Sequence, residues 1–349
     1  MLSMCYHPVY MQPFDFFAVG DIVTEPFIKL INAHVEEGKD GGVPNVCMPA
    51  GDKLPYEEAI ICAAVGNAGN AAVAAARLGL SSGLRSYVGD DASGKEMMEV
   101  LEKEQVDTTH MVTEPGKVSN HHFVLWYGSE RTILVKHETF TYTVPELAQG
   151  PKWMYLSSLA ENSKPYHDAL AVWLSEHPET KLAFQPGTYQ MMLGKEALAA
   201  LYTRSDFFVC NKEEAARILD IPLTSDTKLL LTELAKLGPK VVVVTDGTEG
   251  AYGYDGSRFL RIPIYPDTRG PYERTGAGDA FTSAVVSALA LGKPLDEALL
   301  WGPINSMSVV QEVGAQKGLL TRPELEELLS KAPSAVSYTH LTLPTNREV

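Results

Sequence analysis

The chain has 349 residues, of which 45% are hydrophobic and 21% charged, a composition typical of a globular protein with a sizeable core. Its net charge of −15 argues against nucleic acid or an anionic membrane as a partner. The four cysteines show no metal or disulfide spacing, no apolar run has transmembrane length, and the first twelve residues lack signal-peptide features. We therefore expect a cytoplasmic protein built on one large α/β domain, with or without a small appendage.

The first part of the chain predicts a buried strand followed by short edge strands. An apolar run over residues 14–19 precedes Gly20 and Asp21, which favours a strand that ends in a turn. Residues 26–35 and 45–49 have the character of short strands, and Gly41 and Gly42 between them indicate a turn.

Residues 65–80 predict a glycine-rich turn and an alanine-rich helix that Gly79 ends. The alanines from 71 to 76 suit close packing against a buried sheet. Asn67 and Asn70 precede that face, and two interpretations remain open for them. They could cap the helix, or they could bind a polyol, because an amide offers both donors and acceptors.

Residues 89–96 approach the spacing of a P-loop but lack the Ser or Thr that would bind Mg²⁺. Asp90 and Asp91 would also repel phosphate, so we expect a turn and an N-cap before a helix over residues 95–104. A β-hairpin is predicted over 121–127 and 132–137. We do not expect His121, His122 and His137 to form a metal site, since adjacent strand residues point to opposite faces.

From residue 153 the pattern alternates between strands and helices. Strands are expected over 153–159, 181–184, 207–210 and 240–244, and helices over 166–176, 193–203 and 228–237, with a further helix starting after Asn211. This alternation predicts a mostly parallel sheet with helices on both faces. Ligands bind at the carboxyl ends of such strands, where the polar loops 185–188, 211–214 and 245–250 follow.

Residues 273–283 carry the strongest chemical signal. Gly276 and Gly278 form a small-residue turn before a helix, and Asp279 follows directly. Such a turn presents free backbone N–H groups at the positive end of the helix dipole, which suits a phosphate. An aspartate there would accept a proton from a hydroxyl group that attacks the phosphate. The alternative is an ordinary loop-to-helix junction with a capping aspartate.

Residues 334–349 change in character after a helix over 322–331 and Pro333. They resemble a translated sequencing-adaptor tail, so we expect a non-native, poorly ordered segment and exclude it from the fold.

Taken in order, these motifs resemble the PfkB/ribokinase family of sugar and nucleoside kinases. The resemblance implies that Gly66, Asn67 and Asn70 bind the phosphate acceptor. It implies that the backbone of Gly276, Ala277 and Gly278 forms an anion hole and that Asp279 is the general base. It also implies that Glu214 positions Mg²⁺ through a water molecule, and that residues 314–316 lie near adenine. Further nucleotide contacts are implied for six residues: Asn211, Thr245, Gly247, Gly250, Thr275 and Asn305.

Three parts of that family pattern differ here. Glu273 and Arg274 replace the usual Asp-Thr pair, so the monovalent cation site associated with that pair stays uncertain. The aspartate that grips two sugar hydroxyls corresponds to Glu25, with Asp21 as the other candidate, and Val65 replaces the first glycine of a Gly-Gly pair. These changes bear on the identity of the phosphate acceptor and not on the chemistry of phosphate transfer.

We therefore expect a three-layer α/β/α domain over residues 13–332, with a mostly parallel sheet and a small β-sheet lid from about 22–50 and 119–138. The expected enzyme transfers phosphate from ATP to a small sugar with Mg²⁺, and forms a homodimer through the lid. The alternative is a nucleoside kinase, with Phe27, Phe123 and Trp126 stacking on a base. A non-catalytic sensor of the same fold is disfavoured because Asp279 is present.

Overall fold

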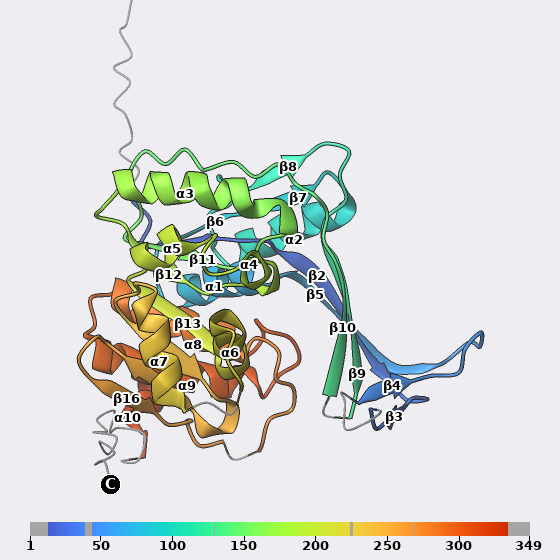
Figure 1. Cartoon of the computed structure of the whole chain (residues 1–349). Coiled ribbons are helices and arrows are strands. Elements are labelled where there is room, and N and C mark those ends of the chain that lie inside the picture. Colours follow the sequence, from blue (N-terminus) through green and yellow to red (C-terminus); the bar gives the residue numbers. More distant parts are fainter. Residues whose placement is uncertain (1–12, 39–43, 129, 224–225, 268, 334–349) are drawn as a thin grey trace, which may run out of the picture.

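A central sheet of eight strands organises the protein (Figure 1). The computed structural model describes residues 13–38, 44–128, 130–223, 226–267 and 269–333. From one edge to the other the strands are β16 (Phe259–Ile262), β15 (Ala251–Tyr254), β14 (Val242–Thr245), β13 (Phe207–Asn211), β12 (Lys181–Phe184), β11 (Trp153–Leu156), β1 (Phe16–Val19) and β6 (Ser82–Arg85). Strands β14, β15 and β16 pair antiparallel, and every other pair in this sheet is parallel.

Helices cover both faces of this sheet, because alternate strand residues point to opposite sides. Phe16 and Ala18 pack into one apolar cluster, while Phe17 and Val19 pack into the other. The first cluster includes residues of α1 (Asn67–Arg77), α2 (Ala92–Lys103), α8 (Ala277–Ala290), α9 (Leu295–Val309) and α10 (Arg322–Ser330). The second includes residues of α3 (Lys164–Glu176), α4 (Thr188–Leu193), α5 (Ala199–Arg204), α6 (Lys212–Leu219) and α7 (Thr227–Lys236). The predicted three-layer α/β/α class is confirmed.

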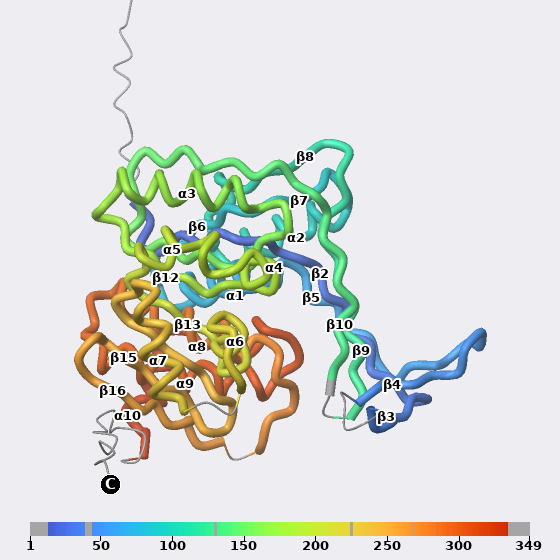
Figure 2. The backbone as a smooth tube through the Cα atoms, viewed as in Figure 1, coloured from blue at the N-terminus to red at the C-terminus, as the bar shows by residue number. Residues whose placement is uncertain are grey.

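A second, smaller sheet projects from this core, and we call it the small sheet. Its strand order is β10 (Glu130–Lys136), β9 (His121–Tyr127), β2 (Val23–Leu30) and β5 (Tyr56–Val65). Figure 2 shows the blue strands β2 and β5 beside the green strands β9 and β10. Strand β5 lies outside the ranges that the sequence suggested for this sheet, because its apolar residues form one run after Glu58 and do not alternate with polar residues.

The inner face of the small sheet packs toward the core through a few large side chains. Phe27, Val124 and Trp126 are buried and form a cluster with Val313. The Trp126 ring also meets Tyr272 edge-on, with ring centroids 5.4 Å apart. Two pairs of short strands complete the topology, β3 (His34–Glu36) with β4 (Asn45–Cys47) and β7 (Tyr87–Gly89) with β8 (Val112–Glu114).

Most predicted elements are present, including one cap that the sequence predicted, and one predicted helix differs. The side chain of Asp91 caps α2 by accepting a hydrogen bond from the Gly94 N–H, which confirms the N-cap prediction for the false P-loop. The single helix predicted over 193–203 is wrong. Gly194 has a φ of +87° and ends α4, so the chain forms two short helices there. The predicted tail, residues 334–349, lies outside the described residues. No described helix has the length and apolar character needed to cross a bilayer.

Candidate active site

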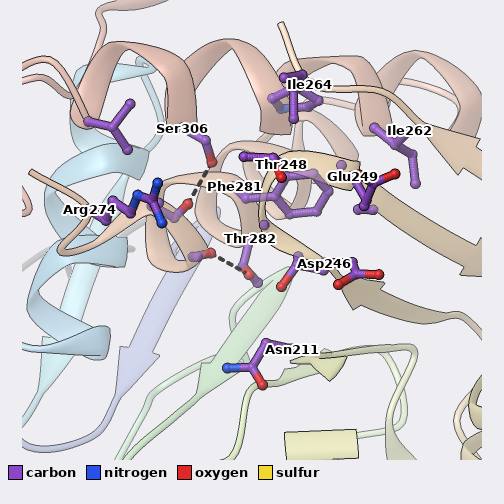
Figure 3. Close-up of a pocket in the computed structure, with 18 of the residues that line it drawn as sticks. Asn211, Asp246, Thr248, Glu249, Ile262, Ile264, Arg274, Phe281, Thr282 and Ser306 are labelled. Atoms are coloured by element: carbon purple, nitrogen blue, oxygen red, sulfur yellow. Dashed lines mark hydrogen bonds between the residues drawn. The ribbon is translucent and has the colours of Figure 1, made fainter. Parts of the chain in front are cut away.

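The N-terminus of α8 is built by the glycine turn that the sequence singled out. Gly276, the N-cap, has a φ of +78°, a conformation that glycine adopts without strain. The Ala280 N–H donates to the Gly276 carbonyl and so closes the first helical turn. The hydroxyls of Ser306 and Thr282 bond the carbonyls of Ala277 and Gly278 at 2.6 and 2.8 Å (Figure 3). These contacts fix the turn and leave the first N–H groups of the helix pointing outward.

Asp279 follows this turn, and amide groups surround its carboxylate. Oδ1 accepts hydrogen bonds from Asn67 Nδ2 and Gln185 Nε2, each at 2.9 Å, and Oδ2 accepts one from Asn70 Nδ2 at 2.8 Å. Asn70 is buried, whereas Asp279 is partly exposed. Both asparagines turn toward the helix that carries Asp279, and α1 begins without a side-chain cap.

Two further contacts fix the direction of these amides. The Tyr155 hydroxyl donates to Gln185 Oε1 at 2.6 Å, so the amide nitrogen of Gln185 must face Asp279. Gln316 Nε2 donates to the Ala64 carbonyl at 2.8 Å and lies 3.2 Å from Asn70 Oδ1. Each amide thus has its donor side directed at the carboxylate.

The pKa of Asp279 lies above the usual aspartate range. Loss of water around the carboxyl group is the main cause, since it disfavours the charged form. Hydrogen bonds from Asn70, Gln185 and Asn67 oppose this rise, and the nearby carboxylate of Glu25 adds to it. A carboxylate with a raised pKa, aimed at a phosphate-binding turn, is suited to accept a proton.

Asp279 lines a cavity of about 770 Å³. Figure 3 shows this cavity, with Arg274, Asn211 and Asp246 among the residues around it. The cavity lies at the carboxyl ends of β12, β13 and β14, where ligands bind in sheets of this kind. Ile264, Phe281, Met307 and Val310 give it an apolar wall, and Arg274 stands on its rim. Nine of the residues predicted to be functional line it: Asn67, Asn211, Glu214, Thr245, Gly247, Gly250, Ala277, Gly278 and Asp279.

Glu214 and Asn211 cap α6 reciprocally at the edge of this cavity. Asn211 Oδ1 accepts from the Glu214 N–H at 2.7 Å, and Glu214 Oε2 accepts from the Asn211 N–H at 2.8 Å. Burial raises the pKa of Glu214, and the Asn211 hydrogen bond opposes the rise. Lys212 of the same turn forms an ion pair with Asp246 at 2.8 Å.

Five residues predicted to contact the nucleotide fall outside the cavity lining: Thr275, Asn305 and residues 314–316. Asn305 is fully buried and joins α8 to the chain before α10, since its amide contacts the Ala280 carbonyl and the Leu320 N–H. Gln316 turns toward Asn70 and not toward the cavity. The Thr275 N–H and hydroxyl both donate to Glu273 Oε1, so this N–H is not free for an anion. The sequence placed these residues by spacing alone, which does not fix the direction of a side chain.

Arg131 of the small sheet reaches the same turn. Its guanidinium lies 2.9 Å from Glu273 Oε1, and the Glu273 side chain is only 4% exposed. Glu273 therefore ties strand β10 to the segment that leads into α8.

On the side of Asp279 that faces the small sheet, carboxylates and histidines gather. Asp21 and Glu25 are buried, and His122 Nδ1 lies 3.1 Å from Glu25 Oε1. His122 and His137 face each other with 3.2 Å between their Nε2 atoms. The β9–β10 register places Val135 opposite His122 and so brings His137 close to it. Gly66, the N-cap of α1, has a φ of +100° and lies beside the Asp21 carbonyl.

The arrangement of a doubly covered sheet, a helix N-terminus with an acid held by three amides, and a small projecting sheet defines the ribokinase-like class of fold. Ribokinase from Arabidopsis thaliana, solved with ribose and ATP, matches 91% of the chain with a TM-score of 0.73 at 18% identity, and 99% of that protein is covered. A nucleoside kinase from Methanocaldococcus jannaschii matches with a TM-score of 0.70 at 19% identity, with the same shares covered.

Sequence comparison gives the family. The pattern of the pfkB family carbohydrate kinases matches residues 46–322, and the chain belongs to this family of phosphotransferases. Ribokinase from Bacillus subtilis strain 168 is 30% identical over 273 residues, which cover 76% of this chain and 87% of the relative. The 5-dehydro-2-deoxygluconokinase of the same organism is 24% identical over 280 residues, which cover 76% and 86%.

Proposed function

We propose that the protein transfers the terminal phosphate of ATP to a hydroxyl group of a small sugar. One observation carries this proposal: Asp279 lines the cavity and also lies near Glu25, which contacts His122 in the buried cluster. A phosphate donor on one side and a polyol on the other would then meet at the carboxylate. The relatives named ribokinase and the ribokinase solved with ribose and ATP support this assignment.

In this proposal Asp279 accepts the proton of the attacking hydroxyl. Its raised pKa favours proton uptake, and the surrounding amides hold it in place. The backbone N–H groups of Gly276 to Gly278 lie at the positive end of α8, where they stabilise negative charge on the transferring phosphoryl group. The Ala277 N–H already has a distant contact to the Arg274 carbonyl at 3.5 Å, which is weak enough to be exchanged.

The nucleotide would occupy the cavity. We propose that its base lies against the apolar wall of Ile264, Met307 and Val310, and that the turn from Thr245 to Gly250 contacts its ribose and phosphates. Gly250 has a φ of +89° and is packed against Ile262 and Pro263, so a side chain at this position is excluded. Arg274 would supply a fixed positive charge near the phosphates.

Mg²⁺ fits the donor set on this side of the cavity. Glu213, Glu214, Asp246 and Glu249 all line it, and Mg²⁺ prefers such oxygen ligands. The cap of α6 uses only Oε2 of Glu214, which leaves Oε1 for a water held by the ion. When bound, Mg²⁺ would neutralise the charge of the phosphates. We propose no monovalent cation site, since Glu273 and Arg274 replace the Asp-Thr pair with which that site is associated.

A sugar suits the acceptor side better than a nucleoside does. Phe27 and Trp126 were candidates for stacking on a base, but both are packed into the cluster with Val124 and Val313. Phe123 lies on the other face of β9 and is 44% exposed. We therefore propose that Asp21, Glu25, Gly66, Asn67 and Asn70 surround a sugar.

We further propose that the small sheet serves as a lid and as the contact between two copies of the chain. Its outer face exposes Ile61, Phe123 and Leu134, which are 65%, 44% and 52% exposed. An uncovered apolar sheet face and edge favour self-association.

We also propose a cytoplasmic location without nucleic-acid or membrane partners. The described cysteines, Cys47, Cys62 and Cys210, are unpaired, which favours a reducing compartment.

The decisive experiment measures ADP release with a panel of pentoses, hexoses and nucleosides, first with the natural protein and then with Asp279→Asn. The amide cannot accept a proton, so we expect the rate to fall by roughly 10²–10⁴ while ATP affinity, measured by calorimetry, stays nearly the same. Retention of more than half of the rate in Asp279→Asn would refute the assignment of the base.

A further inference from the structure

Two short strands, β3 and β4, form a separate ribbon that extends beyond the small sheet (Figure 1). They pair antiparallel with each other and with no further strand of the described chain. None of their residues belongs to the apolar clusters that the described residues form. A two-stranded ribbon without a core is only marginally stable in water, so we looked for another contact that holds the two strands together.

Three side chains of the kinds that bind metal ions gather on one face of this ribbon. His34 and Glu36 are two residues apart on β3 and therefore point to the same side. Cys47 lies directly opposite His34 on β4, and opposed residues share a face. The register thus brings together an imidazole, a carboxylate and a thiol. The match to the family begins at residue 46, so His34 and Glu36 precede it.

The distances between these side chains suit a single ion. His34 Nε2 lies 3.0 Å from Glu36 Oε1. One ligand atom from each of the three side chains lies within 4.8 Å of the other two. Two ligands of a tetrahedral zinc ion are roughly 3.3–3.6 Å apart, given bonds of about 2.0 Å to nitrogen and 2.3 Å to sulfur. Small rotations of these solvent-accessible side chains therefore bring all three ligands to bonding distance.

The types of ligand select the metal. Cys47 forms no disulfide, and a thiolate favours Zn²⁺ over Mg²⁺ and Ca²⁺, which prefer oxygen ligands. Binding displaces the thiol proton of Cys47 to the solvent. In a neutral His34 the ring proton moves from Nε2 to Nδ1, which frees Nε2 for the ion. Three protein ligands leave the fourth tetrahedral position for water.

We propose that His34 Nε2, a carboxylate oxygen of Glu36 and Cys47 Sγ bind one Zn²⁺ ion, which cross-links β3 to β4. Metal binding to a folded site contributes directly to the stability of that fold, so the ion stabilises a ribbon that lacks a core. The site is separate from the Mg²⁺ proposed for the cavity, where carboxylates are the candidate ligands. The inference does not depend on the proposed kinase function.

The first test adds Co²⁺, a spectroscopic probe for zinc sites, to the full chain without nucleotide. Thiolate ligation gives Co²⁺ an intense ultraviolet charge-transfer band, and tetrahedral coordination gives strong visible bands. We expect both to saturate at one Co²⁺ per chain and to be bleached by Zn²⁺, whose filled d shell gives neither. Cys47→Ser should abolish the ultraviolet band. His34→Ala should weaken binding by more than the roughly 10–100-fold that loss of a second-shell partner causes.

Cys62→Ser is the matched control, because Cys62 is also unpaired and half-buried but lies outside this group of ligands. It should keep the ultraviolet band at full intensity, and so should Cys5→Ser. His122→Ala should keep it too, which separates this site from the histidines near Glu25. A natural protein without the band, or a band that survives in Cys47→Ser, would overturn the inference.

The second test asks whether the ion holds the two strands together. Hydrogen exchange of peptides that contain β3 and β4 should slow when Zn²⁺ is added, roughly a hundredfold at a Zn²⁺ concentration of 100 times Kd. Exchange in the strands of the large sheet should stay the same. Glu36→Gln weakens the site without removing the thiol, so it should reduce the protection. Metal binding with unchanged exchange in the ribbon would refute the cross-link.

Discussion

Asp279 combines a raised pKa with hydrogen bonds that favour its charged form, and this balance predicts the pH dependence of the reaction. The base must be ionised to act, so activity is lost as pH falls through its pKa. Because burial raises the pKa of Asp279, the acid limb of kcat/KM should lie above the value of about 3.9 for an ordinary aspartate. A pH profile of ADP release measures it.

Gln185 provides the control for this prediction. Its amide donates to Oδ1 at 2.9 Å and stabilises the ionised carboxylate. Gln185→Ala should therefore move the acid limb to higher pH. A limb at or below pH 3.9, or a shift to lower pH in the variant, would contradict the assignment. The sequence placed Gln185 at the carboxyl end of a strand, but only the structure shows that its amide points at the base.

At the scale of single elements, substitutions of two glycines at the start of α8 separate the effect of the turn on stability from its effect on activity. A side chain at Gly276 would be strained by the φ of +78° and would lie 2.7 Å from the Cα of Ala315. Gly276→Ala should therefore lower the free energy of unfolding by more than about 1 kcal/mol and abolish activity. Urea titration and the ADP assay measure the two effects.

Gly278→Ala is the matched variant in the same turn. A Cβ at Gly278 meets no atom within 4 Å, and the residue lies inside the helix. We expect unchanged or slightly higher stability, since alanine favours a helix, together with reduced activity because the methyl group would enter the cavity. Similar losses of stability in both variants would show that the turn is only a structural junction.

For the molecule as a whole, the exposed face of the small sheet predicts a dimer. Light scattering at micromolar concentration should give twice the chain mass, and Leu134→Glu should give a monomer, because it places a charge in the apolar contact. Val172→Glu is the control, since Val172 is 58% exposed on α3, in the large domain. A natural protein that is monomeric under these conditions would rule out the contact.

The sequence predicted the large domain well and the small sheet only in part. Local signals sufficed for the alternating strands and helices, for the cap at Asp91 and for the turn at Gly276. Strand β5 and the pairing of His122 with His137 were not predictable in the same way, because they depend on which distant segments lie side by side. Asn305 had the right spacing for a nucleotide contact, yet its amide joins α8 to the chain before α10.

Trp126 gives the protein an optical probe where the proposed lid meets the core. Among the four tryptophans it alone belongs to the small sheet, where its ring meets Tyr272 of the segment before α8 and lies under Lys29 at 5.0 Å. If the acceptor moves this sheet, the emission of Trp126 should shift during binding, and stopped-flow fluorescence would time that motion without any attached dye. Trp126→Phe should remove the signal and Trp173→Phe should keep it, whereas a signal that survives in Trp126→Phe would locate the motion elsewhere.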